Sequence, residues 1–307
     1  MTRSQIEFKN SDGITLRGWL YTPDHTKAEK LPAIVMAHGF SALKEMTLDN
    51  YAEAFVANLP MCCLIYDHRG FGESDNAPGQ PREEIVPNLQ IADYSDAITY
   101  ASTRPEINPN KLGVWGTSYS GGHVLVVAAV DRRVKVVLSQ GPCVSGWDNF
   151  HRLVRPDLIP QLDALFRAAD RIARMEGKEA GYLPVVSEDL YGLSCALAGK
   201  EVYDFFMEWQ KKTTWPNRIT IRSMELFRGF EPQQLIEKIS PTPLLLTVPM
   251  NDELTPADLS LIAYDRAREP KELSLLNGGH FDSYRGETLK KNVTRQTEFL
   301  KKWLIDA

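Results

Sequence analysis

The feature that most constrains the fold of this chain is an alternation of short, mainly apolar segments with longer segments of helical pattern. The apolar segments are residues 33–37, 61–66, 112–115, 134–138, 244–248 and 273–276. The segments of helical pattern are residues 43–57, 86–102, 121–130, 256–268 and 286–304. Short apolar runs without regular polar alternation are typical of strands buried on both faces of a parallel sheet. The sequence therefore predicts an α/β fold with a mostly parallel central sheet flanked by helices.

The beginning of the chain follows a different pattern. Residues 6–9 and 14–21 alternate apolar and polar side chains on either side of Asp12-Gly13. This arrangement predicts an antiparallel β-hairpin ahead of the buried strands.

One long segment interrupts the alternation of strands and helices. From residue 146 to residue 230 the pattern is helical and amphipathic, and 12 of the 29 aromatic residues lie there. They are Trp147, Phe150, Phe166, Tyr182, Tyr191, Tyr203, Phe205, Phe206, Trp209, Trp215, Phe227 and Phe230. We expect a helical cap at residues 146–230, inserted into a core formed by residues 1–145 and 231–307. With 12 basic and 12 acidic residues the cap is nearly neutral, which favours an apolar ligand pocket, although many of these rings could simply pack the cap on the core.

Charge and apolar content narrow the function classes. The 307 residues carry a formal net charge of −5, so we expect no nucleic-acid partner and no anionic membrane partner. The longest apolar run, residues 124–130, is far shorter than the roughly 20 residues of a membrane-spanning helix. No signal peptide is visible, and the adjacent Cys62 and Cys63 should point to opposite faces of a strand. We therefore expect a cytoplasmic protein without a disulfide framework, and the sequence leaves a homodimer open.

The most informative segment is residues 112–122, LGVWGTSYSGG, in which a buried strand runs through a tight turn into a helix. Ser118 stands at the turn, with the small residues Gly116 and Ser120 two positions away on either side, as in a nucleophile elbow. Small neighbours are needed because the turn brings backbone atoms close together. Ser120 also has small neighbours at this spacing, but the strand ends just before Thr117, which favours Ser118. The alternative is a Gly/Ser-rich turn without chemistry.

A serine hydroxyl needs a general base, and the base needs an acid to orient it. His280 follows the last strand-like segment and so should lie at the carboxyl edge of the sheet, where sites of open α/β sheets form. Asp252 follows the segment 244–248 and should lie at the same edge. Glu253 is one residue further from the strand and is the weaker candidate, while a helix-capping role is the alternative for Asp252.

The other histidines fit the role of base less well. They are His25, His38, His68, His123 and His151. His25 lies in a loop, His151 in the cap and His123 on a helix among core residues. His38 and His68 lie close to glycines at strand ends, where we expect them to help shape the site.

An acyl-transfer site also needs preorganised N–H donors for the oxyanion. The backbone N–H of Tyr119, directly after the nucleophile, is one candidate. The second is the N–H of Phe40, in the loop that follows residues 33–37. No metal-ligand cluster, phosphate-binding loop or dinucleotide fingerprint occurs at convincing spacing, so we expect no cofactor and no metal.

These residues together resemble the α/β-hydrolase superfamily over almost the whole chain. The similar motifs are His38-Gly39-Phe40, residues 66–74 (YDHRGFGES), the elbow, Asp252-x-x-x-Pro256 and Gly279-His280-Phe281. The order Ser118, Asp252, His280 is also that of the superfamily. Residues 116–123 and 139–142 are similar to microbial polyketide-processing hydrolases and polyketide transferases, and loosely to Xaa-Pro dipeptidyl peptidase-like hydrolases. Serine at the elbow argues against dehalogenases and epoxide hydrolases, which use Asp there, and against dienelactone hydrolases, which use Cys.

The residues and the resemblance leave three functions to compare. The first is a serine hydrolase that cleaves a carboxylic ester or thioester of an uncharged, largely apolar small molecule through an acyl-serine intermediate. An acyltransferase would form the same intermediate and pass a polyketide-type acyl group to an alcohol or amine. A non-catalytic small-molecule binding protein is the third, against which the complete set of site residues weighs.

Overall fold

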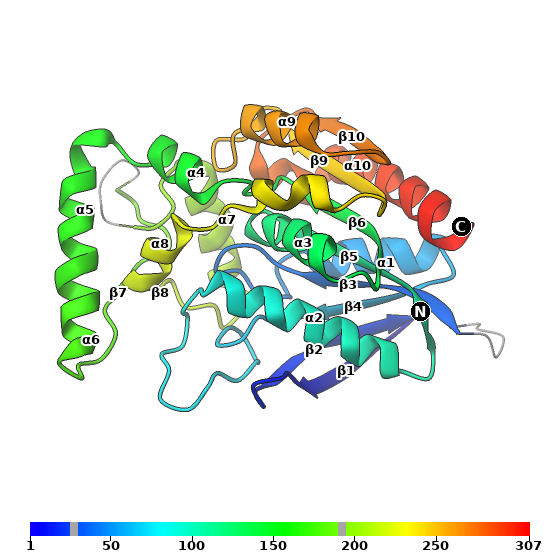
Figure 1. The fold of residues 1–307 in the computed structure, drawn as a ribbon, viewed down its shortest axis with the longest axis horizontal. Helices are drawn as coiled ribbons and strands as arrows, with labels where there is room; N and C mark the ends of the chain where they lie inside the picture. Colours follow the sequence, from blue (N-terminus) through cyan, green and yellow to red (C-terminus); the bar gives the residue numbers. More distant parts are fainter. Residues whose placement is uncertain (25–29, 190–194) are drawn as a thin grey trace.

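In the computed structural model, an eight-stranded sheet runs through the molecule and helices cover both of its faces (Figure 1). The structure describes residues 1–24, 30–189 and 195–307, so His25 and Tyr191 lie outside the described residues. The strands of this sheet are β1 (Thr2–Lys9), β2 (Thr15–Thr22), β3 (Leu31–Ala37), β4 (Cys62–Tyr66), β5 (Ile107–Thr117), β6 (Val134–Gln140), β9 (Leu244–Pro249) and β10 (Lys271–Leu276).

The strand order confirms the predicted hairpin and the mostly parallel sheet. Across the sheet the order is β1-β2-β4-β3-β5-β6-β9-β10. β1 pairs antiparallel with β2, and β2 pairs antiparallel with β4. From β4 to β10 every neighbouring pair is parallel. The carboxyl ends of β3, β5, β6, β9 and β10 therefore share one edge of the sheet.

Two layers of helices enclose the sheet. The first consists of α1 (Leu48–Asn58), α10 (Gly286–Leu300) and the π-helix η5 (Lys301–Ile305), and the second of α2 (Pro87–Thr103), α3 (Tyr119–Val130) and α9 (Ala257–Arg266). Cys63 of β4 belongs to the same hydrophobic cluster as Phe55 of α1, whereas Cys62 belongs to the cluster that contains Tyr94 of α2. The prediction that these adjacent cysteines point to opposite faces is confirmed.

The start of α1 differs from the sequence prediction. The pattern predicts a helix from residue 43, but α1 begins at Leu48. The preceding residues are drawn toward the loop after β4, because the buried Lys44 donates two hydrogen bonds to the Asp67 carboxylate. One comes from its backbone N and one from Nζ, and each has a length of 2.8 Å. Thr47 then has a φ of 77°, which a regular helix does not allow.

A long segment leaves the sheet after β6 and returns to it at β9. It contains α4 (Gly146–Leu153), η1 (Pro156–Leu158), α5 (Ile159–Leu165), η2 (Phe166–Ile172), α6 (Ala173–Met175), β7 (Tyr182–Leu183), α7 (Lys200–Gln210), β8 (Ile219–Thr220), α8 (Ile221–Phe227) and η3 (Pro232–Lys238). The sequence pattern indicates helices only, but β7 and β8 form a short antiparallel sheet. In Figure 1 the rod of α5 and α6 stands at the end of the molecule furthest from the chain termini.

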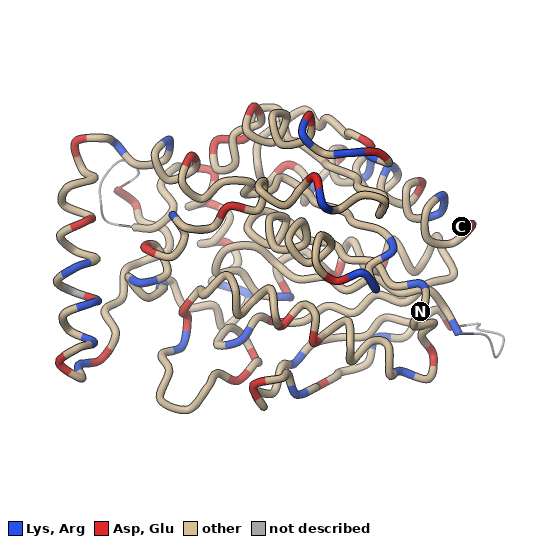
Figure 2. Tube along the Cα trace, viewed as in Figure 1, with Lys and Arg blue, Asp and Glu red and all other residues tan. Residues whose placement is uncertain are grey.

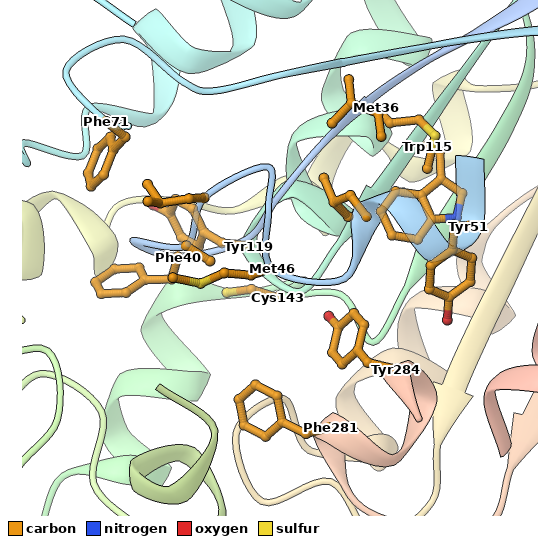
Figure 3. Close-up of a cluster of buried hydrophobic side chains, with 14 of the residues drawn as sticks. Met36, Phe40, Met46, Tyr51, Phe71, Trp115, Tyr119, Cys143, Phe281 and Tyr284 are labelled. Atoms are coloured by element: carbon orange, nitrogen blue, oxygen red, sulfur yellow. The ribbon is translucent and has the colours of Figure 1, made fainter. Parts of the chain in front are cut away.

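The segment between β6 and β9, which we call the inserted segment, shares one hydrophobic cluster with the core. Phe205 of α7 and Phe227 of α8 are buried with Tyr119 and Phe281 of the core. Figure 3 shows the core side of this cluster, where Tyr119 and Phe281 lie with Phe40 near the carboxyl edge of the sheet. The helical cap at residues 146–230 stays a prediction.

Charges of both signs occur in the core and in the inserted segment (Figure 2). Most arginines of the inserted segment are paired with carboxylates, such as Arg228 with Asp163 and Arg174 with Asp170. Among the helices of the described residues, none has the length and apolar character required to span a lipid bilayer.

Candidate active site

Ser118 occupies a sharp turn between β5 and α3. Its φ of 57° and ψ of −119° lie in a region that costs a residue with a side chain about 1–3 kcal/mol. The turn requires small neighbours: a Cβ on Gly116 would lie 2.0 Å from the carbonyl oxygen of Ser120, and one on Gly39 would lie 2.7 Å from Cβ of Ser118. The strand, turn and helix of an elbow are therefore present at the predicted residue, and Ser118 is half-buried.

Ser120 has a different environment from Ser118. It is fully buried, and its hydroxyl donates to the carbonyl oxygen of His38. Its Oγ also lies 2.9 Å from Nε2 of His68 and 3.2 Å from Nδ1 of His123. Burial lowers the pKa of His68 to about 3 and that of His123 well below its usual value. Ser120 thus belongs to a buried network of neutral histidines, while Ser118 is only half-buried.

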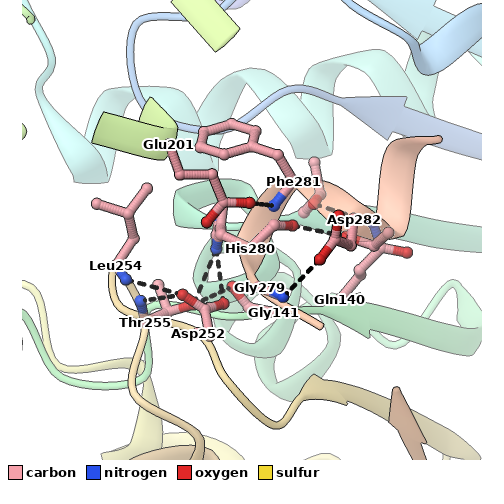
Figure 4. A network of polar contacts seen from close by, with 12 residues as sticks. Gln140, Gly141, Glu201, Asp252, Leu254, Thr255, Gly279, His280, Phe281 and Asp282 are labelled. Carbon is pink, nitrogen blue, oxygen red and sulfur yellow. Dashed lines mark hydrogen bonds and ion pairs between the residues drawn. The ribbon is translucent and has the colours of Figure 1, made fainter. Parts of the chain in front are cut away.

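His280 and Asp252 meet at the carboxyl edge of the sheet (Figure 4). Nδ1 of His280 lies 2.7 Å from Oδ2 of Asp252. Oδ1 of Asp252 accepts from the backbone N–H groups of Leu254 and Thr255, both at 2.8 Å, and Oδ2 accepts from Oγ1 of Thr255 at 2.7 Å. These hydrogen bonds hold the Asp252 carboxylate in place independently of its contact with the imidazole.

The protonation of His280 reflects opposing effects. Burial disfavours the charged imidazole, but the Asp252 carboxylate and, more weakly, the Glu201 carboxylate outweigh it and raise the pKa of His280 above its usual value. His280 is only 3% exposed and Asp252 is also buried, so water screens the interaction between these two residues little.

The end of β6 lies between the turn of Ser118 and the His280–Asp252 pair. The backbone N–H of Ser118 donates to the carbonyl oxygen of Gln140 at 2.8 Å. At the next residue, a Cβ on Gly141 would lie 3.7 Å from Cε1 of His280 and 3.5 Å from Oδ2 of Asp252. The structure thus brings Ser118, Asp252 and His280 to one stretch of the sheet edge.

The loop after β3 passes directly beside Ser118. The position of a Cβ on Gly39 is 3.2 Å from Oγ of Ser118, so the next residue, Phe40, follows at the turn. His38 holds this loop: its Nδ1 accepts from the N–H of Gly39 at 2.8 Å, and its Nε2 lies 2.7 Å from the carbonyl oxygen of Met46. Because burial lowers the pKa of His38 to about 4, the imidazole is neutral and can donate from Nε2 to Met46. The rings of Phe40 and Tyr119, the two predicted oxyanion residues, are in edge contact at 5.6 Å.

Comparison with known proteins decides the family. Residues 12–282 match the family described as X-Pro dipeptidyl-peptidase (S15 family). The chain belongs to the S15 family. A relative of this S15-family protein, a polyketide transferase from Penicillium sp, is 32% identical over 98% of this chain and 97% of its own length. A thiohydrolase from Eupenicillium brefeldianum is 30% identical over 97% and 94% of the two chains.

Solved structures place the S15-family protein among the α/β hydrolases. The crystal structure of an α/β hydrolase from Penicillium sp. sh18 matches it with a TM-score of 0.83 and 30% identity, over 99% of this chain and 100% of that chain. The α/β-hydrolase fold is therefore confirmed, and the chain is an enzyme of hydrolase type.

A cluster of carboxylates in the S15-family protein has the geometry of a metal site but is filled by a lysine. In the described part of the chain, Glu45, Asp67 and Glu73 form the grouping of this kind. Nζ of Lys44 lies 2.8 Å from Glu45, 2.8 Å from Asp67 and 2.7 Å from Glu73. The ammonium group takes the position that a cation would need, so these residues do not fit a metal ion.

Sequence reasoning missed contacts that come from distant parts of the S15-family chain. Oε1 of Gln140 accepts from Tyr51 of α1 and from Asn292 and Gln296 of α10, which anchors the residue that holds Ser118. Glu201 of α7 accepts from the backbone N–H of Phe281, 80 residues away. Neither contact leaves a local sequence signal, because each depends on how separate elements pack.

Proposed function

We propose that this protein is a serine hydrolase that cleaves a carboxylic ester or thioester of an uncharged, largely apolar small molecule. Ser118 is the nucleophile, His280 the general base and acid, and Asp252 the residue that orients His280. The observation that carries the proposal is the buried contact of 2.7 Å between His280 and Asp252, at the same sheet edge as a half-buried serine with a φ of 57°. The N–H groups of Phe40 and Tyr119 serve as the oxyanion hole.

The reaction follows from these positions in two steps. Nε2 of His280 takes the proton of Ser118 as Oγ attacks the acyl carbon, and the oxyanion forms against the two N–H groups. The tetrahedral intermediate collapses when His280 gives the proton to the leaving alcohol or thiol, which leaves an ester on Ser118. His280 then deprotonates a water molecule that attacks this ester, and Ser118 regains its proton as the carboxylic acid leaves.

The side chains near the sheet edge support an apolar acyl group. Phe227 of α8 lies 5.9 Å from Phe40 and stacks on Tyr119 at 5.6 Å between ring centroids. Phe205 of α7 stacks on Phe281 at 4.1 Å, next to His280. Since two relatives are named a polyketide transferase and a thiohydrolase, a polyketide-type acyl thioester is the substrate class that we favour.

The nucleophile assignment is tested with a fluorophosphonate probe and peptide mapping. We expect the probe to modify Ser118 in the wild-type protein, and a Ser118→Ala variant to lose labelling and about 10⁴-fold or more in kcat. Ser120→Ala is the matched control and should keep substantial activity and labelling. Labelling of the Ser118→Ala protein would overturn the assignment, and a wild-type protein that resists the probe would support a binding protein without turnover.

Substrate class is tested by a panel of p-nitrophenyl esters and acyl thioesters of graded chain length. We expect turnover of medium-length, uncharged acyl groups and weak turnover of short or charged ones. An X-Pro p-nitroanilide should be included, because turnover of this substrate alone would replace the proposed ester or thioester specificity with the activity in the family's name.

Acyl transfer is the second candidate, because relatives named polyketide transferase align over nearly the whole chain. It differs from hydrolysis only in the molecule that attacks the acyl-enzyme. Products should be analysed by mass spectrometry with and without an added alcohol or amine. Free acid as the main product in both reactions supports hydrolysis, while an ester or amide that replaces the acid supports transfer.

A further inference from the structure

A carboxylate of the inserted segment contacts the turn that carries His280. Glu201 lies in the first turn of α7, and its Oε1 accepts from the backbone N–H of Phe281 at 3.0 Å. Figure 4 shows the Glu201 side chain extending over His280 to reach this N–H. A Cβ on Gly279 would lie 2.6 Å from Oε2 of Glu201, so the absence of a side chain at residue 279 lets the carboxylate approach.

The same helix also packs against the ring of Phe281. Phe205, one helical turn after Glu201, stacks on this ring with a centroid distance of 4.1 Å and an interplanar angle of 21°. Phe206 makes an edge contact with it at 6.4 Å. α7 therefore contacts both the backbone and the side chain of the residue that follows His280.

A core residue within the turn itself binds the start of the turn. The Asp282 carboxylate accepts from the N–H of Gly279 at 2.8 Å. Arg285 lies 3.7 Å from Asp282 and 4.0 Å from Glu201. His280 thus sits in a turn whose first N–H is bound by the core and whose later N–H is bound by the inserted segment.

The charged and titratable groups that face His280 come from several elements. Asp252 contacts Nδ1 from the loop after β9, and the neutral His38 faces His280 from the loop after β3. Asp282 and Arg285 flank the turn, and Glu201 is the group supplied by the inserted segment. Because Glu201 is 31% exposed, its electrostatic effect on His280 is partly screened by water.

We infer that Glu201 is a positioning residue for the reaction: its carboxylate fixes the Gly279–Phe281 turn and so makes the placement of His280 depend on α7 of the inserted segment. This inference rests on the proposed function of His280 as the base. It differs from a purely local role, in which an acidic residue in the first turn only stabilises the start of a helix.

Three variants separate these roles. Glu201→Ala removes both the hydrogen bond and the charge, and we expect kcat to fall about 10- to 100-fold with little change in KM, because a misplaced base slows the chemical step. Glu201→Gln keeps an oxygen that can accept from Phe281, so kcat should be largely restored. It removes the negative charge, so the acid limb of kcat/KM should move to lower pH. Glu208→Gln, which removes an exposed carboxylate of α7 that is paired with Lys212, is the matched control and should leave both readouts unchanged.

The measurements are kcat, KM and the pH profile of kcat/KM, together with the melting temperature of each variant. A wild-type kcat in Glu201→Ala, or a loss of kcat in Glu201→Gln as large as that in Glu201→Ala, overturns the inference. Equal losses in Glu201→Ala and Glu208→Gln that follow their melting temperatures also overturn it in favour of a helix-stability role. If the fluorophosphonate probe labels Ser118 but the Glu201 variants keep the wild-type kcat, the proposed function stands and this inference alone is wrong.

Discussion

The pair of His280 and Asp252 shows how single residues set the chemistry of this site. Asp252 receives its own hydrogen bonds from Leu254 and Thr255, so it cannot turn away from the imidazole without losing them. A base held in this way keeps Nε2 free of a proton when His280 is neutral. The rate of acylation should therefore follow the fraction of neutral His280.

The pH dependence of this fraction is a direct prediction. Because the pKa of His280 is raised, kcat/KM should increase with pH through a midpoint above about 6.5, the usual value for histidine. Asp252→Asn should move the midpoint to lower pH, since the carboxylate favours the charged imidazole, and should lower kcat about 10³- to 10⁴-fold. Initial rates over a pH series measure both effects. Glu253→Gln, at the neighbouring exposed carboxyl, is the control, and an unchanged midpoint in Asp252→Asn would contradict the assignment.

The sequence could indicate Ser118, Asp252 and His280 because each lies shortly after the end of a strand, where short-range patterns are strong. The sequence also places His38 near the site, but the contacts behind these three residues could not be found in this way. The imidazole of His38 acts on the backbone of its own loop, and Glu201 depends on the packing of α7 against the turn after β10. Their roles arise only from contacts made in three dimensions.

At the scale of elements, the β3 loop packs closely against the elbow, and this packing fixes the position of the proposed oxyanion hole. A Cβ at residue 39 would lie 2.7 Å from Cβ of Ser118, which is too short for a real contact, and 3.0 Å from the carbonyl oxygen of Thr117, which is unusually tight. Either the loop or the turn must shift when this space is filled. The N–H of Phe40 would move with the loop.

We therefore expect Gly39→Ala to fold but to lose about 10- to 100-fold in kcat. Gly229→Ala, where the nearest atom would be 3.7 Å away, is the control and should behave as the wild type. Steady-state kinetics and circular dichroism of the two variants check this. A Gly39→Ala protein with full activity would mean that the β3 loop does not contribute to the oxyanion hole.

Element boundaries show where sequence patterns stop being informative. The limits of α2 differ from the predicted segment by only one residue at each end. This prediction is accurate because the apolar face of the helix is a pattern among residues close together in the sequence. The predicted start of α1 is wrong by five residues because Lys44 is bound by Asp67, 23 positions later. Likewise, the two-residue strands β7 and β8 are too short to have a recognisable period and exist because they pair with each other.

At the scale of the whole molecule, the inserted segment and the core are joined by a common hydrophobic cluster. Phe205 is 7% exposed and packs on Phe281 of the core. Unfolding of either the inserted segment or the core would therefore expose apolar surface on both. A cluster of this kind favours one cooperative unfolding transition over two separate ones.

Phe205→Ala should lower the free energy of unfolding by about 3–5 kcal/mol through the cavity it leaves. Urea denaturation followed by both circular dichroism and tryptophan fluorescence should give coincident transitions for the wild-type protein. Trp147→Ala, at an aromatic residue that is 55% exposed, should change stability much less. Two separated transitions in the wild type would show that the inserted segment unfolds independently of the sheet.

The adjacent cysteines of β4 can report local opening of the structure on the two faces of the sheet. Both thiols are 0% exposed, and burial raises the pKa of Cys62 to about 12 and the pKa of Cys63 well above its usual value. Since only a thiolate alkylates readily, iodoacetamide should modify either residue only after the layer of helices above it has moved away. Tandem mass spectrometry of the peptide would record which thiol reacts first. Modification of Cys63 alone would reveal a state in which α1 and α10 detach while α2 and α3 stay in place.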